Sequence, residues 1–95
     1  MILSADAVDP DVFVWDDRAR LVAYALGDWG DTRSVMNHTI LAHPGTQAIV
    51  LSCEPGVIRP KYGEVSEDAV RVKMTSGPFR GRAGWVASGD VHASR

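Results

Sequence analysis

"SGPFRGRAGWV" occupies residues 76–86 and combines three glycines, a proline and two arginines with a phenylalanine and a tryptophan. Gly77 and Gly81 can adopt positive φ at low cost, which is typical of a hairpin loop. Gly84 stands just before Trp85 inside the returning strand, where a glycine indicates a bulge or a close backbone approach. Small barrels need such points to bend and close, so the stretch predicts a barrel corner with Trp85 in the core.

Strands are predicted on both sides of this loop. Residues 69–77, "AVRVKMTSG", alternate between an apolar face of Val70, Val72 and Met74 and a polar face of Arg71, Lys73 and Thr75. This period of two predicts one buried and one wet face. Residues 82–88, "RAGWVAS", form the returning strand. Residues 46–54, "TQAIVLSCE", are mostly apolar and predict a largely buried strand, which a long connection over residues 55–68 follows.

The N-terminal half joins a short β-prone run to helical signals. Residues 12–15, "VFVW", predict a first strand. Asp16 or Asp17 can cap a helix over residues 18–26, although "LVAYAL" within that segment also fits a buried strand.

A second helix is predicted from about residue 32 through Leu41, ended by Pro44. Its inner face would hold Val35, Met36, Thr39 and Ile40. Residues 16–43 are therefore interpreted as a helical insertion.

Two motifs resemble bacterial Src-homology-3-type barrel domains: Pro44-Gly45-Thr46 entering a strand, and Gly84-Trp85-Val86 ending a hairpin. "SGPFRGRAG" is also similar to the KOW element of ribosomal and transcription factors, itself a piece of such a barrel. The resemblance covers about residues 44–92 and implies a mainly β, five-stranded Src-homology-3-like barrel with an α-helical insertion after the first strand. The whole chain, 1–95, would be one domain, with its barrel over 44–93.

Composition and charge limit the class of ligand and the cellular compartment that we expect. A net charge of −2 argues against a protein that is mainly a polyanion binder. A single cysteine excludes an intramolecular disulfide and favours a reducing compartment. The N-terminal residues lack the basic and apolar regions of a signal peptide, and no apolar run approaches membrane-spanning length. We expect a cytoplasmic protein without membrane association.

Ligand-binding candidates lie in the connection and the hairpin. Basic side chains cluster there, and Phe79 could stack on a base while arginines hold phosphate. An ordinary charged sheet edge explains the same residues. Tyr62 could contribute to an aromatic groove for a peptide or small molecule. The candidates are Lys61, Tyr62, Lys73, Phe79, Arg80 and Arg82.

Metal binding and catalysis find little support in the sequence. The soft ligands His38, His43, Cys53 and His92 share no ligand spacing, so we expect no metal and no cofactor. No nucleophile motif or phosphate loop is present. The resemblance implies a small bacterial non-enzymatic binding or interaction module. The alternative is a KOW-like nucleic-acid-binding protein, and an enzyme on a small oligomeric barrel ranks third.

Self-association is expected through the insertion. Its helices carry more apolar residues than a small barrel can cover, and an uncovered apolar patch usually marks an interface. We therefore predict a homodimer with Trp29 as its anchor and Met36 and Tyr24 beside it.

Overall fold

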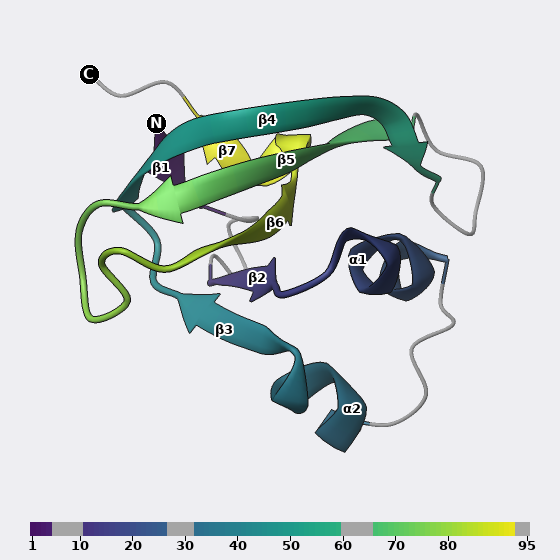
Figure 1. The fold of residues 1–95 in the computed structure, drawn as a ribbon, viewed down its shortest axis with the longest axis horizontal. Coiled ribbons are helices and arrows are strands. Elements are labelled where there is room, and N and C mark those ends of the chain that lie inside the picture. Colours follow the sequence, from purple (N-terminus) through teal and green to yellow (C-terminus); the bar gives the residue numbers. More distant parts are fainter. Residues whose placement is uncertain (5–10, 27–31, 60–65, 93–95) are drawn as a thin grey trace.

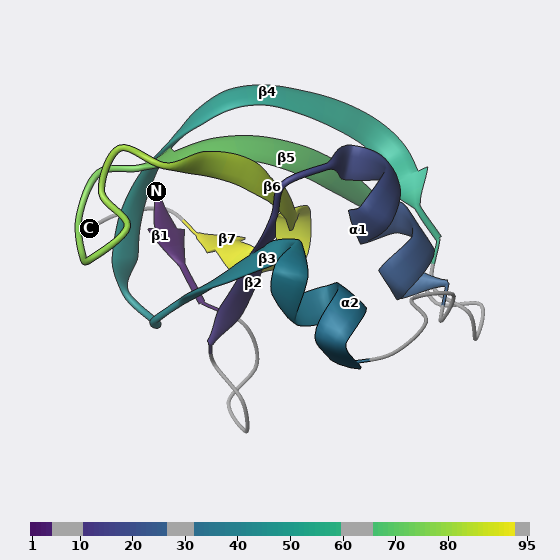
Figure 2. The ribbon, with the colours of Figure 1, turned by 60° about the horizontal axis from the view of Figure 1, so that its bottom comes forward.

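The computed structural model describes residues 1–4, 11–26, 32–59 and 66–92. These form a curled antiparallel sheet, or half-barrel, in the order β3-β2-β6-β5-β4-β1-β7 (Figures 1 and 2). The strands are β1 (Ile2–Leu3), β2 (Val12–Trp15), β3 (Thr39–Ala42), β4 (Thr46–Ile58), β5 (Glu67–Met74), β6 (Ala83–Ala87) and β7 (Val91–His92). The helices are α1 (Arg18–Ala25), α2 (Thr32–Asn37) and the short 3-10 turn η1 (Ser88–Asp90).

The prediction of five strands is wrong, since the described residues contribute seven to the sheet. The first and last strands, β1 and β7, hold two residues each and pair with one another through Ile2↔His92 and Leu3↔Val91. Two residues are too few to show an alternating pattern in sequence. Their pairing depends on contact between distant parts of the chain.

The predicted helix over residues 18–26 is confirmed as α1, which settles the alternative of a strand there. The Asp17 side chain caps it by accepting the Ala19 N–H at 2.7 Å.

The second predicted helix is correct only in its first half. α2 ends at Asn37, and residues 39–42 form β3, which pairs with β2 from Trp15↔Thr39 to Val12↔Ala42. Thr39 and Ile40 are β-branched and favour a strand once a partner is present. The helical insertion is therefore shorter than 16–43, and its last residues belong to the sheet.

β4 departs most from the prediction. It extends to Ile58 and so includes the start of the predicted connection. Its middle, residues 49–53, is exposed rather than largely buried. Apolar composition predicted the strand correctly, but it could not show that these residues are exposed.

Two apolar clusters share the sheet. The first fills the half-barrel and confirms the predicted apolar face of β5; it comprises Leu3, Val12, Val14, Ala42, Ala48, Val70, Val72, Met74 and Val86. The second lies between the sheet and the helices; it comprises Trp15, Leu21, Val35, Ile58 and Ala69. Trp85, expected inside the barrel, is half-buried and packs against the second cluster.

Gly84 confirms the predicted close approach of two backbones. β6 meets β2 at the pair Trp15↔Trp85. A Cβ on Gly84 would lie 2.7 Å from the Trp15 carbonyl oxygen and 2.5 Å from Val14 Cγ1. The loop before β6 also behaves as predicted, because Gly77 and Gly81 have φ of +78° and +90°.

Candidate functional site

A pocket of about 340 Å³ lies where α1 meets the sheet. This volume is within the range of small-ligand sites. Its lining comes from α1, from strands β2, β4, β5 and β6, and from η1. The lining residues are Asp11, Phe13, Trp15, Leu21, Tyr24, Ala25, Ile58, Glu67, Ala87 and Asp90.

Three aromatic rings line the pocket and pack against one another. Tyr24 packs edge-on against Phe13, with ring centroids 6.1 Å apart and planes at 71°. The centroid of the Tyr24 ring also lies 5.2 Å from that of Trp15. Trp15 is almost fully buried in the second cluster and so anchors the three rings there. Phe13 is 36% exposed and Tyr24 is half-buried, so both present ring surface to a ligand. The rings come from β2 and α1, whose relative positions the second cluster determines.

Carboxylates line the same pocket. Asp11, Glu67 and Asp90 line the pocket, and none of the described residues that line it is Lys or Arg. Glu67 Oε1 accepts the Gly89 N–H at 2.9 Å, which holds this side chain across the turn η1. Asp11 Oδ1 lies 3.7 Å from His43 Nδ1. The pocket therefore combines aromatic faces with negative charge, an arrangement that attracts cations.

The predicted ligand-binding residues do not gather in this pocket. Phe79 packs against the first cluster, which limits its ring as a stacking platform. Arg80 and Arg82 are exposed around the hairpin loop, and Lys73 is exposed on β5 opposite Ile49 and Ala83. Lys61 and Tyr62 lie outside the described residues.

The three residues predicted to form a dimer interface also do not gather at one place in the described structure. Tyr24 lines the pocket, and Met36 projects from α2 with 69% of its surface exposed. Trp29 lies outside the described residues, so its role as a dimer anchor stays a prediction.

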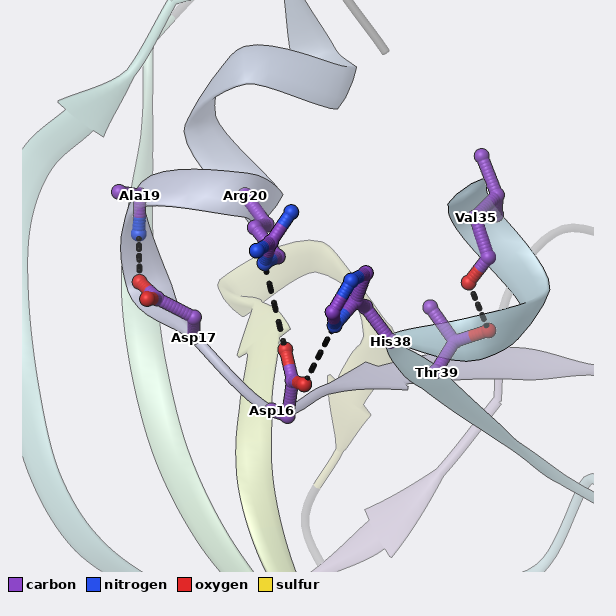
Figure 3. Close-up of polar contacts among 7 residues, drawn as sticks. All are labelled: Asp16, Asp17, Ala19, Arg20, Val35, His38 and Thr39. Atoms are coloured by element: carbon purple, nitrogen blue, oxygen red, sulfur yellow. Dashed lines mark hydrogen bonds and ion pairs between the residues drawn. The ribbon is translucent and has the colours of Figure 1, made fainter. Parts of the chain in front are cut away.

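Asp16 and His38 are among the residues that line a smaller hollow of about 130 Å³. Figure 3 shows the two side chains directed toward each other. His38 Nδ1 lies 2.8 Å from Asp16 Oδ2, and the Asp16 N–H donates to the His38 carbonyl at 3.0 Å. The neighbouring hydroxyl of Thr39 donates to the Val35 carbonyl and is not directed at this histidine. The pair connects the residue after β2 with the residue before β3, so it joins the two ends of the segment that contains α1 and α2.

The four soft side chains have separate neighbours. His38 and His43 lie beside Asp16 and Asp11, and His92 Nε2 is 3.0 Å from the Ser4 carbonyl. Cys53 lies beside Asp68. No group of three metal-ligating side chains occurs among the residues that the structure describes.

Cys53 offers a test of local electrostatics. The pKa of its thiol is raised, first by desolvation and then by the adjacent Asp68 carboxylate, whose Oδ2 lies 3.8 Å from Sγ. Because the thiolate is the reactive form, we expect Cys53 to react with iodoacetamide at neutral pH more slowly than the same thiol in urea-unfolded protein. Asp68→Asn should accelerate the reaction. Equal rates in the folded and unfolded protein would contradict this prediction.

No protein-family model matches the chain, and neither a curated protein nor a solved structure matches it. The structure supports a mostly β, curled half-barrel; the finer resemblance to Src-homology-3 or KOW domains stays a prediction. None of the helices described is both long and apolar enough to cross a membrane.

Proposed function

We propose that this chain is a small non-enzymatic binding module whose pocket beneath α1 receives a cationic group on an apolar stem, such as a basic side chain of a partner peptide. The observation that carries the proposal is that Phe13 and Tyr24 line the same pocket as the carboxylates of Asp11, Glu67 and Asp90. The aromatic rings and the carboxylates both favour a positively charged ligand.

Both halves act on a cation by known forces. An ammonium or guanidinium group over an aromatic face gains about 0.5–2 kcal/mol, depending on how far it is desolvated. The carboxylates that line the pocket add Coulomb attraction, which weakens with salt. An anionic ligand such as a nucleic-acid phosphate would meet repulsion from the same carboxylates, so this pocket does not favour the nucleic-acid alternative.

A binding role accounts for the pocket better than catalysis does. A nucleophile needs a general base within hydrogen-bond reach. Among the described residues, the closest Asp–His pair, Asp16 and His38, lies in the other hollow, where Thr39 donates to a backbone carbonyl.

Choline and its neutral isostere 3,3-dimethylbutan-1-ol provide a direct test by NMR titration. We expect choline to shift the amide resonances of Tyr24, Ala25 and Ala87, with a dissociation constant on the order of millimolar, and the neutral isostere to bind at least about fivefold more weakly. Added salt should weaken the binding of choline but not the binding of the neutral isostere.

Variants assign the binding to the pocket. Tyr24→Leu should remove a ring face, and Glu67→Gln should remove a charge while keeping an acceptor for the Gly89 N–H; each should weaken choline binding about three- to tenfold. Glu54→Gln is the matched control, because Glu54 pairs with Arg18 at 2.8 Å outside the pocket. Equal binding of choline and its isostere, or equal loss in the control, would overturn the proposal.

A further inference from the structure

Strands β2 and β6 separate next to the pocket. Among the residues that the structure describes, the two strands share a single pair, Trp15↔Trp85. A continued antiparallel register would bring Phe13 opposite Ala87, two residues along each strand, but these two residues are not paired. Phe13 and Ala87 both line the pocket beneath α1. The pocket therefore includes the gap where the two strands part.

The backbone groups of Phe13 face this gap. Along an antiparallel strand, every second residue directs its N–H and C=O to the same neighbouring strand. The Asp16 N–H donates to the His38 carbonyl at 3.0 Å, on the side of β3. Because the register between β2 and β3 is regular, Val14 bonds to β3 as well, and Phe13 directs its N–H and C=O toward β6.

Ala87 presents its backbone groups to the same gap from the other strand. The Met74 N–H donates to the Arg82 carbonyl at 2.9 Å, and the register between β5 and β6 is regular from there through Ala69↔Ala87. By the same alternation, Ala87 directs its N–H and C=O away from β5 and toward β2. The gap thus holds two backbone donors and two backbone acceptors that β2 and β6 do not use for each other.

Side-chain hydrogen bonds hold the end of β6 to β5 rather than to β2. The Ser88 hydroxyl accepts the Asp68 N–H at 3.1 Å, and Glu67 Oε1 accepts the Gly89 N–H at 2.9 Å. Both bonds lie directly after Ala87, where β6 ends and η1 begins. Because these contacts fix the chain in the free protein, a ligand that bonds in the gap does not need to order it.

We infer that the cation bound in the pocket belongs to a lysine or arginine residue within a peptide chain, whose main-chain amide hydrogen-bonds to Phe13 and Ala87 in the gap. This inference rests on the proposed function and adds the partner's main chain to it. A peptide unit has one donor and one acceptor, which match the backbone groups that face the gap. A free ammonium ligand such as a polyamine has donors but no acceptor for the two N–H groups.

The distance from the gap to a pocket carboxylate suits a basic side chain. Glu67 lies two residues before Ala69, the partner of Ala87 on β5. Alternation therefore places Glu67 on the same face as Ala69, about 7 Å along the strand. An extended lysine side chain spans roughly 6 Å from Cα to Nζ. A residue anchored at Ala87 can therefore reach Glu67 with its charged end.

Two ligands with the same cation test the main-chain contact by NMR titration. Nα-acetyl-lysine-N-methylamide carries two peptide groups, whereas n-butylammonium is the lysine side chain alone. We expect the lysine amide to bind at least about tenfold more tightly than n-butylammonium, because only it can satisfy the groups in the gap. It should also move the amide proton resonances of Phe13 and Ala87 downfield, as hydrogen bonds form there.

A backbone variant assigns this gain to the gap. Ala87→Pro removes an N–H that does not bond to β5, and the φ of Ala87, −74°, is one that proline adopts. The variant should weaken binding of the lysine amide about three- to tenfold and leave the binding of n-butylammonium unchanged. Ala87→Ser is the matched control, because it keeps the N–H and should bind both ligands as the wild type does.

The outcomes separate this inference from the proposed function. Equal affinities for the two ligands, or an equal loss of both in Ala87→Pro, would show a cation site without main-chain recognition and would refute the inference alone. If neither ligand binds, and choline does not bind either, the proposed function fails and the inference fails with it. If the proline variant does not fold, hydrogen exchange of the wild-type Ala87 amide takes its place: the lysine amide should slow it and n-butylammonium should not.

Discussion

Leu3→Ala should lower the free energy of unfolding by about 3 kcal/mol, a large share of the stability of a domain this size. Leu3 is fully buried in the first cluster although its strand, β1, has only two residues. The side chain closes the half-barrel from the side where β1 and β7 pair. Its removal leaves a cavity that the packed strands around it cannot collapse to fill. Urea denaturation followed by tryptophan fluorescence measures the loss.

Ile2→Ala is the matched control for this prediction. Ile2 is the other residue of the strand and is only partly buried, so its truncation should cost about 1 kcal/mol or less. If both variants unfold at the same urea concentration as wild type, β1 is not docked in solution and the closed end of the half-barrel is not as described.

Gly84→Ala should destabilise the fold by about 2–3 kcal/mol through overpacking. Its new methyl group would overlap the Trp15 carbonyl and Val14, at 2.7 and 2.5 Å, and a backbone oxygen cannot rotate away as a side-chain end can. The pairing of β2 with β6 must therefore loosen. Thermal unfolding by circular dichroism measures the effect, which for a domain of this size corresponds to a decrease in Tm of roughly 8–20 °C.

Gly89→Ala separates overpacking from the general effect of replacing a glycine. A Cβ at Gly89 would meet only the carboxyl end of the flexible Glu67 side chain, at Oε1 and Cδ. We expect a loss of under about 1 kcal/mol, mainly from the hydrogen bond between the Gly89 N–H and that carboxylate. Comparable losses in the two variants would show that the contact at Gly84 is not specially tight.

The sequence predicted the features that neighbouring residues determine. The turn glycines, the close approach at Gly84, the alternating face of β5 and the cap of α1 all follow from local conformational preference and period. These features agree with the structure because tertiary packing reinforces the local preference at each of them.

The features that distant residues determine were not predictable in the same way. Residues 39–42 fit a helical pattern, and they form β3 because β2 offers them a partner. The middle of β4 reads as a buried strand, yet residues 49–53 are exposed in the described structure. An apolar run shows that a strand is present but does not show whether it lies at the centre or the edge of a sheet.

The pocket could be predicted only in part. Phe13 falls between the buried Val12 and Val14, so alternation along β2 directs it away from the first cluster. No such signal connects it to Tyr24 on α1 or to Glu67 and Asp90, which stand more than fifty positions later. Only the folded chain brings rings and carboxylates together.

The pairing of β2 also constrains the order in which the chain can fold during synthesis. Trp15 emerges from the ribosome early, but its partner on β6, Trp85, follows seventy positions later. The pairing of Leu3 with β7 is delayed further, because its partner there is Val91. The hairpin of β4 and β5 can form as soon as it is translated, whereas "VFVW" remains without one of its two neighbouring strands until β6 has emerged. Val12, Val14 and Trp15, which are buried in the folded protein, therefore remain incompletely paired while the intervening seventy positions are translated.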